Sequence, residues 1–158
     1  MLSEEITRLI GKGGDTQIFE VEKGAIKKYA DAVEDLNPLY WDEEYAGNLK
    51  YGSITAPPGF FGWPTKWARK TAFFFATTVE LEMAMTKAGY KRTIDGGIEY
   101  QFFTPVRAGD TLSASSVIKD IAERKGRTET MAFVVTETTY TNQNGDLVAI
   151  SRWISIHS

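Results

Sequence analysis

One short segment of this sequence holds the side chains best suited to acid–base chemistry. This first segment, YADAVEDLNPLYWDEEYA at residues 29–46, places Asp35, Asn37 and Tyr40 close together. A carboxylate can hold a water molecule and accept its proton. A tyrosine, with an unperturbed pKa of about 10, is a poor base at neutral pH but a usable hydrogen-bond donor. We take Asp35, Tyr40 and Asn37 as candidate catalytic residues, with an open alternative for Asp35, which could equally cap a turn.

The second segment, APPGFFGWP at residues 56–64, contains three prolines and two glycines. Proline removes a backbone N–H and fixes φ, so this composition excludes a continuous helix.

Histidine and cysteine chemistry is almost absent from this chain. It has one histidine, His157, and no cysteine. These counts exclude a disulfide scaffold, a thiolate zinc site, a cysteine nucleophile and a Ser-His-Asp triad in the middle of the chain. We expect His157, next to the last residue, to be a fraying terminal residue rather than a catalyst. No metal site and no cofactor are expected.

Length and charge point to one globular domain spanning residues 1–158. The 18 basic and 21 acidic residues give a net charge of −3, and no basic stripe is present, so nucleic acid is not an expected partner. No apolar run approaches the roughly 18 residues that span a bilayer. The first ten residues are acidic where a secretory signal is basic. We therefore expect a cytoplasmic protein without a membrane segment.

The first half of the chain contains mostly helical patterns. The GKGGD run at 11–15 lacks the spacing of a phosphate-binding loop and precedes a strand, which favours a plain turn. Alternation predicts that strand over Thr16–Val21, and apolar residues on one face predict a helix over Glu22–Glu34. Asp42–Leu49 is a second, short helix.

The second half changes from helix to strand. A long helix is predicted over Thr65–Lys87, and the aromatic residues within and just before it are either core, an oligomer face or the wall of an apolar pocket. Asn144-Gly145 is a strong hairpin signal between the last two strands. Helices followed by an antiparallel meander indicate the α+β class. The aromatic residues in question are Trp63, Trp67, Phe73, Phe74 and Phe75, and the predicted strands are Ile98–Phe102, Leu112–Ile121, Thr128–Tyr140 and Leu147–Ile156.

Together with YGSITAPPGF at 51–60 and QFFTPVRAGDTL at 101–112, the segment at 29–46 resembles the MaoC-type family of (R)-specific enoyl-CoA hydratases and 3-hydroxyacyl-thioester dehydratases. The family motif reads aromatic, then G-D-x-N-P-x-H, then five residues and a small one. Asp35, Asn37, Pro38 and Ala46 stand at the matching positions. The resemblance implies a hot-dog fold, in which an antiparallel sheet wraps around a helix and pairs with a second hot-dog unit. It favours Glu22–Glu34 as the helix near the motif and makes the longer segment an insertion.

In catalytic members the aspartate and histidine of the motif activate a water, and a backbone N–H polarises the thioester carbonyl. This sequence departs from that pattern twice. Tyr40 replaces the histidine, and Pro58 stands at a glycine position, where it has no N–H to donate. By the same resemblance, the acyl thioester would lie against Ala56, Pro57, Gly59 and Phe60.

These losses resemble a branch of the family in which two hot-dog units divide the work. One unit keeps the Asp/His pair, and the degenerate unit shapes the tunnel for the acyl tail. The resemblance therefore implies a subunit of an (R)-specific enoyl-thioester hydratase or dehydratase, with an acyl-CoA or acyl-carrier-protein thioester as ligand. The chain would form a homo-oligomer, or a heteromer with a catalytic hot-dog subunit. Two alternatives stay open: a self-sufficient homodimeric hydratase or thioesterase that uses Asp35, and a non-enzymatic acyl-CoA-binding module.

Overall fold

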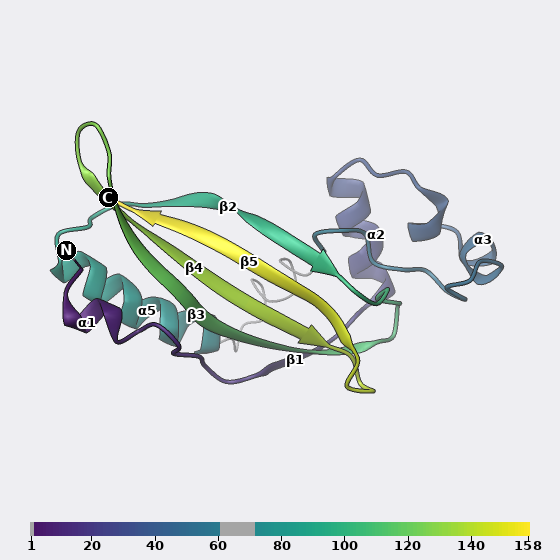
Figure 1. Cartoon of the computed structure of the whole chain (residues 1–158). Helices are drawn as coiled ribbons and strands as arrows, with labels where there is room; N and C mark the ends of the chain where they lie inside the picture. The colour runs from purple at the N-terminus through teal and green to yellow at the C-terminus, as the bar shows by residue number, and fades with distance from the viewer. Residues whose placement is uncertain (1, 61–71) are drawn as a thin grey trace.

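The fold is built on one antiparallel sheet. The computed structural model describes residues 2–60 and 72–158. Within them five strands pair in the order β1-β3-β4-β5-β2 (Figure 1). Every strand expected from the alternation of apolar residues is present. The strands are β1 (Gln17–Glu20), β2 (Thr93–Phe102), β3 (Thr111–Lys125), β4 (Thr130–Thr141) and β5 (Leu147–His157).

The turn between β4 and β5 confirms the Asn-Gly signal. Gly145 has a φ of 82°, in the left-handed region that glycine adopts without strain. The side-chain oxygen of Asn142 accepts hydrogen bonds from the N–H groups of Asn144 at 2.9 Å and Asp146 at 3.0 Å. This compact turn helps to set the strand register, which decides the face that each side chain occupies.

The three predicted helices are present, and the first two of them, α2 and α3, are shorter than expected. Two further helical segments, α1 and the 3₁₀ turn η1, are too short to show an apolar period in the sequence, so only their caps could have marked them. Ser3 caps α1 by accepting a hydrogen bond from the N–H of Ile6. No helix in the described ranges is long and apolar enough to cross a membrane. The helical segments are α1 (Glu4–Thr7), α2 (Lys23–Ala32), η1 (Pro38–Tyr40), α3 (Glu43–Gly47) and α5 (Ala72–Lys87).

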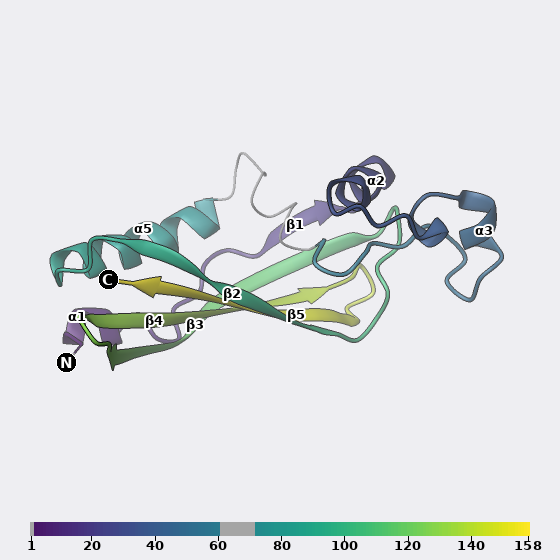
Figure 2. The ribbon, with the colours of Figure 1, turned by 90° about the horizontal axis from the view of Figure 1, so that it is seen from above.

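Helices α2 and α5 lie on the same side of the sheet, toward opposite ends (Figure 2). Leu81 and Met85 of α5 belong to the core cluster that holds Ile118 of β3 and Val134 of β4. The expectation that the longer helix is an insertion is therefore wrong, because α5 covers the sheet itself. Helix α2 covers the other end, where Ile26 packs in a second core cluster. Trp63 and Trp67 lie outside the described residues, and the side chains of Phe73, Phe74 and Phe75 are not described, so the role of these aromatic residues stays a prediction.

The expectation that His157 frays is also wrong. It is the last residue of β5, pairs in register with Thr93, and its side chain is only 1% exposed. Its Nε2 is 3.0 Å from the hydroxyl of Ser155, and its Nδ1 is 3.3 Å from the hydroxyl of Thr93. The strand pairing holds this end of the chain in place, so being near the terminus does not make His157 mobile.

Candidate functional site

A tight turn leads from α2 into the motif. Glu34 has a φ of 55°, in the left-handed region that non-glycine residues rarely adopt. The family motif that this chain resembles has a glycine where this chain has Glu34. The left-handed backbone conformation explains why the motif has glycine there. The N–H of Asp35 donates to the carbonyl of Ala30 at 2.9 Å, and the indole N–H of Trp41 donates to the carbonyl of Asp35 at 2.9 Å. Both bonds hold the turn against the end of the helix.

The polar side chains of the motif are engaged in this turn. One carboxylate oxygen of Asp35 accepts a hydrogen bond from the N–H of Asn37 at 3.1 Å. The side-chain oxygen of Asn37 accepts from the N–H of Leu39 at 3.0 Å and caps η1, which begins at Pro38. Such local side-chain-to-backbone bonds define Asx turns and helix caps. Asp35 and Asn37 thus shape the backbone that carries Tyr40 into the core.

The side chain of Tyr40 is buried, and its hydroxyl is a hydrogen-bond donor. Only 8% of the residue is exposed, and it packs in the core cluster that also holds Ile26 and Phe60. Burial raises the pKa of its hydroxyl, and the nearby Asp35 carboxylate and Tyr51 raise it further. The phenol therefore stays protonated at neutral pH and can donate a hydrogen bond, but it cannot serve as a base.

Residues 56–60 form a turn held by the core. The N–H of Ala56 donates to the carbonyl of Val106 at 2.8 Å, which ties the start of the turn to the chain before β3. Gly59 has a φ of 85°, and a Cβ at this position would lie 2.6 Å from the Tyr29 hydroxyl. That hydroxyl donates to the carbonyl of Pro58 at 3.4 Å. The positive φ favours glycine at this position, and any larger residue would also require the Tyr29 hydroxyl to move.

A pocket of about 350 Å³ opens between the two segments and the end of β2. Tyr40 lines it together with Ala56 and Pro58. The opposite wall comes from the last residue of β2 and the residues that follow this strand, so the pocket joins parts of the chain that are far apart in sequence. The full lining is Leu39, Tyr40, Tyr51, Thr55, Ala56, Pro58, Phe102, Phe103, Thr104, Pro105 and Val106.

The pocket offers apolar surface and hydroxyl groups. No charged residue is part of its lining as described, and the polar groups of its side chains are the hydroxyls of Tyr40, Tyr51, Thr55 and Thr104. His157 lies at the opposite end of the β2–β5 pair, because it pairs with Thr93, whereas the lining residue Phe102 pairs with Ala149. Such a pocket suits an apolar chain with one or two hydrogen-bonding groups. It holds no group that would exchange protons near neutral pH.

The structure brings together some of the residues predicted from the sequence and separates others. Tyr40 and Ala56 share the pocket, while Asp35 and Asn37 belong to the turn beside it. Pro57 and Phe60 are fully buried beneath the loop, and Gly59 lies against Tyr29 rather than in the lining. The wall formed by Tyr51, Thr55, Phe102 and Phe103 was not among the residues predicted from the sequence. Its signal was the QFFTP run at 101–105, which carried the resemblance but had no assigned role.

Comparison with known proteins identifies the family. The pattern of the FAS1-like dehydratase domain region matches residues 8–151. A UPF0336 protein of Streptomyces avermitilis is 33% identical over 111 residues, covering 70% of this chain and 69% of that protein. A protein of Thermomonospora curvata named probable enoyl-CoA hydratase alpha subunit is 27% identical over 139 residues, covering 81% of this chain but 42% of that protein.

Two solved complexes from Mycobacterium tuberculosis share the fold. A chain of the ChsH1-ChsH2 complex superposes with a TM-score of 0.79 at 17% identity, over 97% of this chain and 93% of that one. A chain of C-terminally truncated HadBC, a 3R-hydroxyacyl-ACP dehydratase complex, superposes with a TM-score of 0.69 at 26% identity, over 94% and 96% of the two chains. With its sheet, its helix and its motif segments in these positions, the chain belongs to the FAS1-like dehydratase region family and has the hot-dog fold of the MaoC-like hydratases and dehydratases.

Proposed function

We propose that residues 1–158 form one hot-dog unit of an (R)-specific enoyl-thioester hydratase or 3-hydroxyacyl-thioester dehydratase, and that this unit shapes the acyl site while a second, histidine-bearing unit performs the proton transfer. The observation that carries the proposal is the position of Tyr40. It lines an uncharged pocket at the place where the family has its histidine, and its pKa is raised rather than lowered. General acid–base catalysis at neutral pH needs a group with a pKa near 7.

Strand β2 supports the pairing with a second unit. It forms one edge of the sheet, and in the described chain it pairs only with β5. Ile94 is 54% exposed and Ile98 is 50% exposed on this edge strand. An open edge with apolar side chains is a template for a strand from another chain. Both M. tuberculosis structures are of complexes, which supports a heteromeric partner for this chain as well.

The pocket supports an acyl thioester as the ligand. Aromatic and aliphatic side chains make up most of its wall, as expected for a site that holds a hydrocarbon tail. The hydroxyls of Tyr40 and Thr55 can orient a carbonyl or hydroxyl group of the ligand. Both an acyl-CoA and an acyl-carrier-protein thioester would present this tail.

A self-sufficient enzyme that uses Asp35 as its base is the second candidate function. The position of Asp35 next to Tyr40 favours it, because the carboxylate acts on the phenol electrostatically. The hydrogen bond that one carboxylate oxygen of Asp35 accepts from the N–H of Asn37 weighs against it, since this bond gives Asp35 a structural role in the turn.

Turnover by the purified chain separates the two functions. The chain is isolated from its own host by an affinity tag, and hydration of crotonyl-CoA is measured with co-purifying proteins present and again after they are removed. We expect hydration only with a second hot-dog protein that carries an intact Asp/His motif. Robust hydration by the single chain would overturn the division of labour and favour the self-sufficient enzyme. Binding of a non-hydrolysable acyl-CoA without turnover in either preparation would indicate a binding module.

A further inference from the structure

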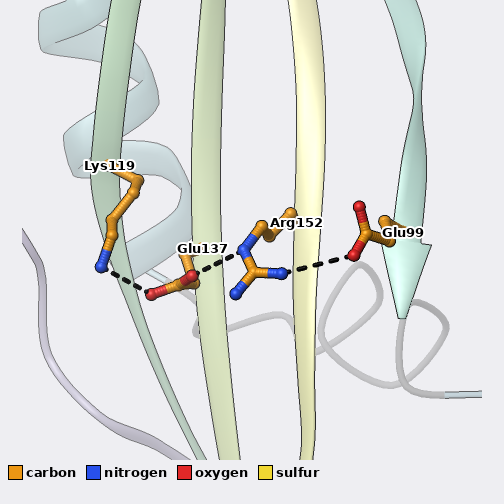
Figure 3. Close-up of polar contacts among 4 residues, drawn as sticks. All are labelled: Glu99, Lys119, Glu137 and Arg152. Carbon is orange, nitrogen blue, oxygen red and sulfur yellow. Dashed lines mark hydrogen bonds and ion pairs between the residues drawn. The ribbon is translucent and has the colours of Figure 1, made fainter. Parts of the chain in front are cut away.

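Four charged side chains cross the sheet in a row of alternating sign (Figure 3). Lys119 of β3 contacts Glu137 of β4 at 3.0 Å, Glu137 contacts Arg152 of β5 at 2.8 Å, and Arg152 contacts Glu99 of β2 at 3.3 Å. The order across the sheet is therefore plus, minus, plus, minus. We call this row the charge ladder. Its two inner members are shielded, whereas the end members Lys119 and Glu99 are 58% and 64% exposed.

The charge ladder lies on the sheet face that the helices leave open. Successive side chains of a strand point to opposite faces of the sheet. In β4, Ala132 and Val134 are buried on the face toward the helices, so Glu137, an odd number of residues away, points to the other face. Figure 2 shows α2 and α5 together on the other side. Beside the ladder, the open face carries half-buried apolar side chains at registered positions. These are Phe133 and Val135 of β4, opposite Ile156 and Ile154 of β5.

We propose that this open face binds the same face of a second copy of the chain, with the two-fold axis parallel to the strands and between β4 and β5. The order of charges carries the assignment. A row of plus, minus, plus, minus becomes minus, plus, minus, plus when it is reversed. A copy turned about this axis therefore places an opposite charge over every member of the ladder.

The contacts follow from the strand order. Lys119 lies over Glu99 of the second copy, and Glu137 lies over Arg152 of the second copy. Packed sheets are about 10 Å apart, a gap that a lysine and a glutamate extending toward each other can bridge. The rotation keeps each residue at its level along the strands. Val135 therefore meets Ile154, and Phe133 meets Ile156, so apolar groups also face apolar groups.

Other arrangements do not fit the charges. A two-fold axis along the ladder, perpendicular to the strands, would place each ladder residue over the same residue of the second copy. Like charges would then face each other at all four positions. Pairing through the edge of β2 uses a different surface and does not bring position 99 near position 119 of another chain, since β3 and β2 are separated by β4 and β5. Face-to-face association of the sheets is thus compatible with the edge pairing of the proposed function and independent of it.

Charge reversal at the two exposed ends tests the proposal with the full chain and without substrate. Lys119→Glu makes both ends acidic, and Glu99→Lys makes both ends basic. Each variant alone places like charges opposite each other twice in the dimer. When the two variants are mixed, both contacts between chains become attractive again. Lys87→Glu is the matched control, because it reverses an exposed lysine in another ion pair, with Glu5, away from this face.

The mass of each sample is measured by sedimentation velocity at micromolar concentration. We expect the wild type and Lys87→Glu to reach twice the mass of either reversal variant. Each reversal should weaken self-association roughly tenfold to a hundredfold. The equimolar mixture of the two reversal variants should restore the larger mass. Damage within one chain would not be repaired by mixing. The proposal is overturned if the wild type is a 17.7 kDa monomer, if a single reversal keeps the wild-type mass, or if the mixture stays at the smaller mass.

Discussion

The carboxylate of Asp35 accepts a hydrogen bond from the backbone N–H of Asn37, 3.1 Å away, and this bond closes the turn in front of Tyr40. An acid at this position of a hydratase motif suggests a base, but the contact is that of a turn-forming residue. The turn therefore gives Asp35 a structural role that does not require proton transfer.

This relationship predicts a mild effect of Asp35→Asn. The asparagine oxygen accepts the same bond, so we expect the free energy of unfolding to stay within about 0.5 kcal/mol, whereas Asp35→Ala costs about 1 kcal/mol because the N–H of Asn37 loses its acceptor. Hydration by the chain together with its partner should keep at least half of the parent rate in the asparagine variant. A loss of about a hundredfold, measured with crotonyl-CoA, would identify Asp35 as a catalytic base.

Substituting Tyr40 by histidine should not create an enzyme from the isolated chain. The imidazole would restore a group that titrates near neutrality, but Pro58 still offers no N–H to the thioester carbonyl, and a lost donor of this kind costs about 10²–10³ in rate. We expect crotonyl-CoA hydration by Tyr40→His to remain within about tenfold of the background, and Tyr40→His with Pro58→Gly to exceed the single variant. Tyr40→Phe is the control for packing. Equal rates for the single and double variants would show that Pro58 is not the missing donor.

Glycine at position 34 should stabilise the protein. The left-handed conformation of Glu34 costs an ordinary side chain about 1 kcal/mol, part of which the larger unfolded-state entropy of glycine offsets. We expect Glu34→Gly to gain about 0.5 kcal/mol and to raise the Tm by roughly 1–2 °C in thermal unfolding. Lys28→Gly, inside α2, is the control and should lose about 1 kcal/mol. A loss of stability in Glu34→Gly would mean that its side chain makes up for the strain.

His157 should make stability fall as the pH drops below its ordinary pKa of 6.5. Burial lowers the pKa of this imidazole in the folded state, and Glu82, 4.0 Å away, offsets only part of the effect. Between the two pKa values the unfolded chain binds a proton that the folded chain does not, so acid favours unfolding. His157→Gln keeps a hydrogen-bonding side chain but does not titrate. Urea unfolding at pH 7.5 and 5.5 should show a smaller loss in the variant, and parallel losses would contradict this account.

The local features of this protein could be predicted from its sequence. Alternating apolar residues marked the strands, and Asn144-Gly145 marked the last hairpin, because both signals depend on neighbours within a few residues. The spacing of Asp35, Asn37 and Pro38 marked the motif and, through it, the family. The sequence also allowed Asp35 to be a turn-forming residue, because that role depends only on residues one or two positions away.

The features that the sequence left undecided depend on contacts between distant segments. The burial of His157 comes from pairing with Thr93, and the second wall of the pocket comes from Phe102 and Phe103, which lie near Tyr40 only when the sheet has formed. The charge ladder needs the register of four strands before its signs alternate. Sequence patterns report the side-chain period along one element, whereas register and packing between elements are set by the core as a whole, so only the tertiary structure decided which residues meet.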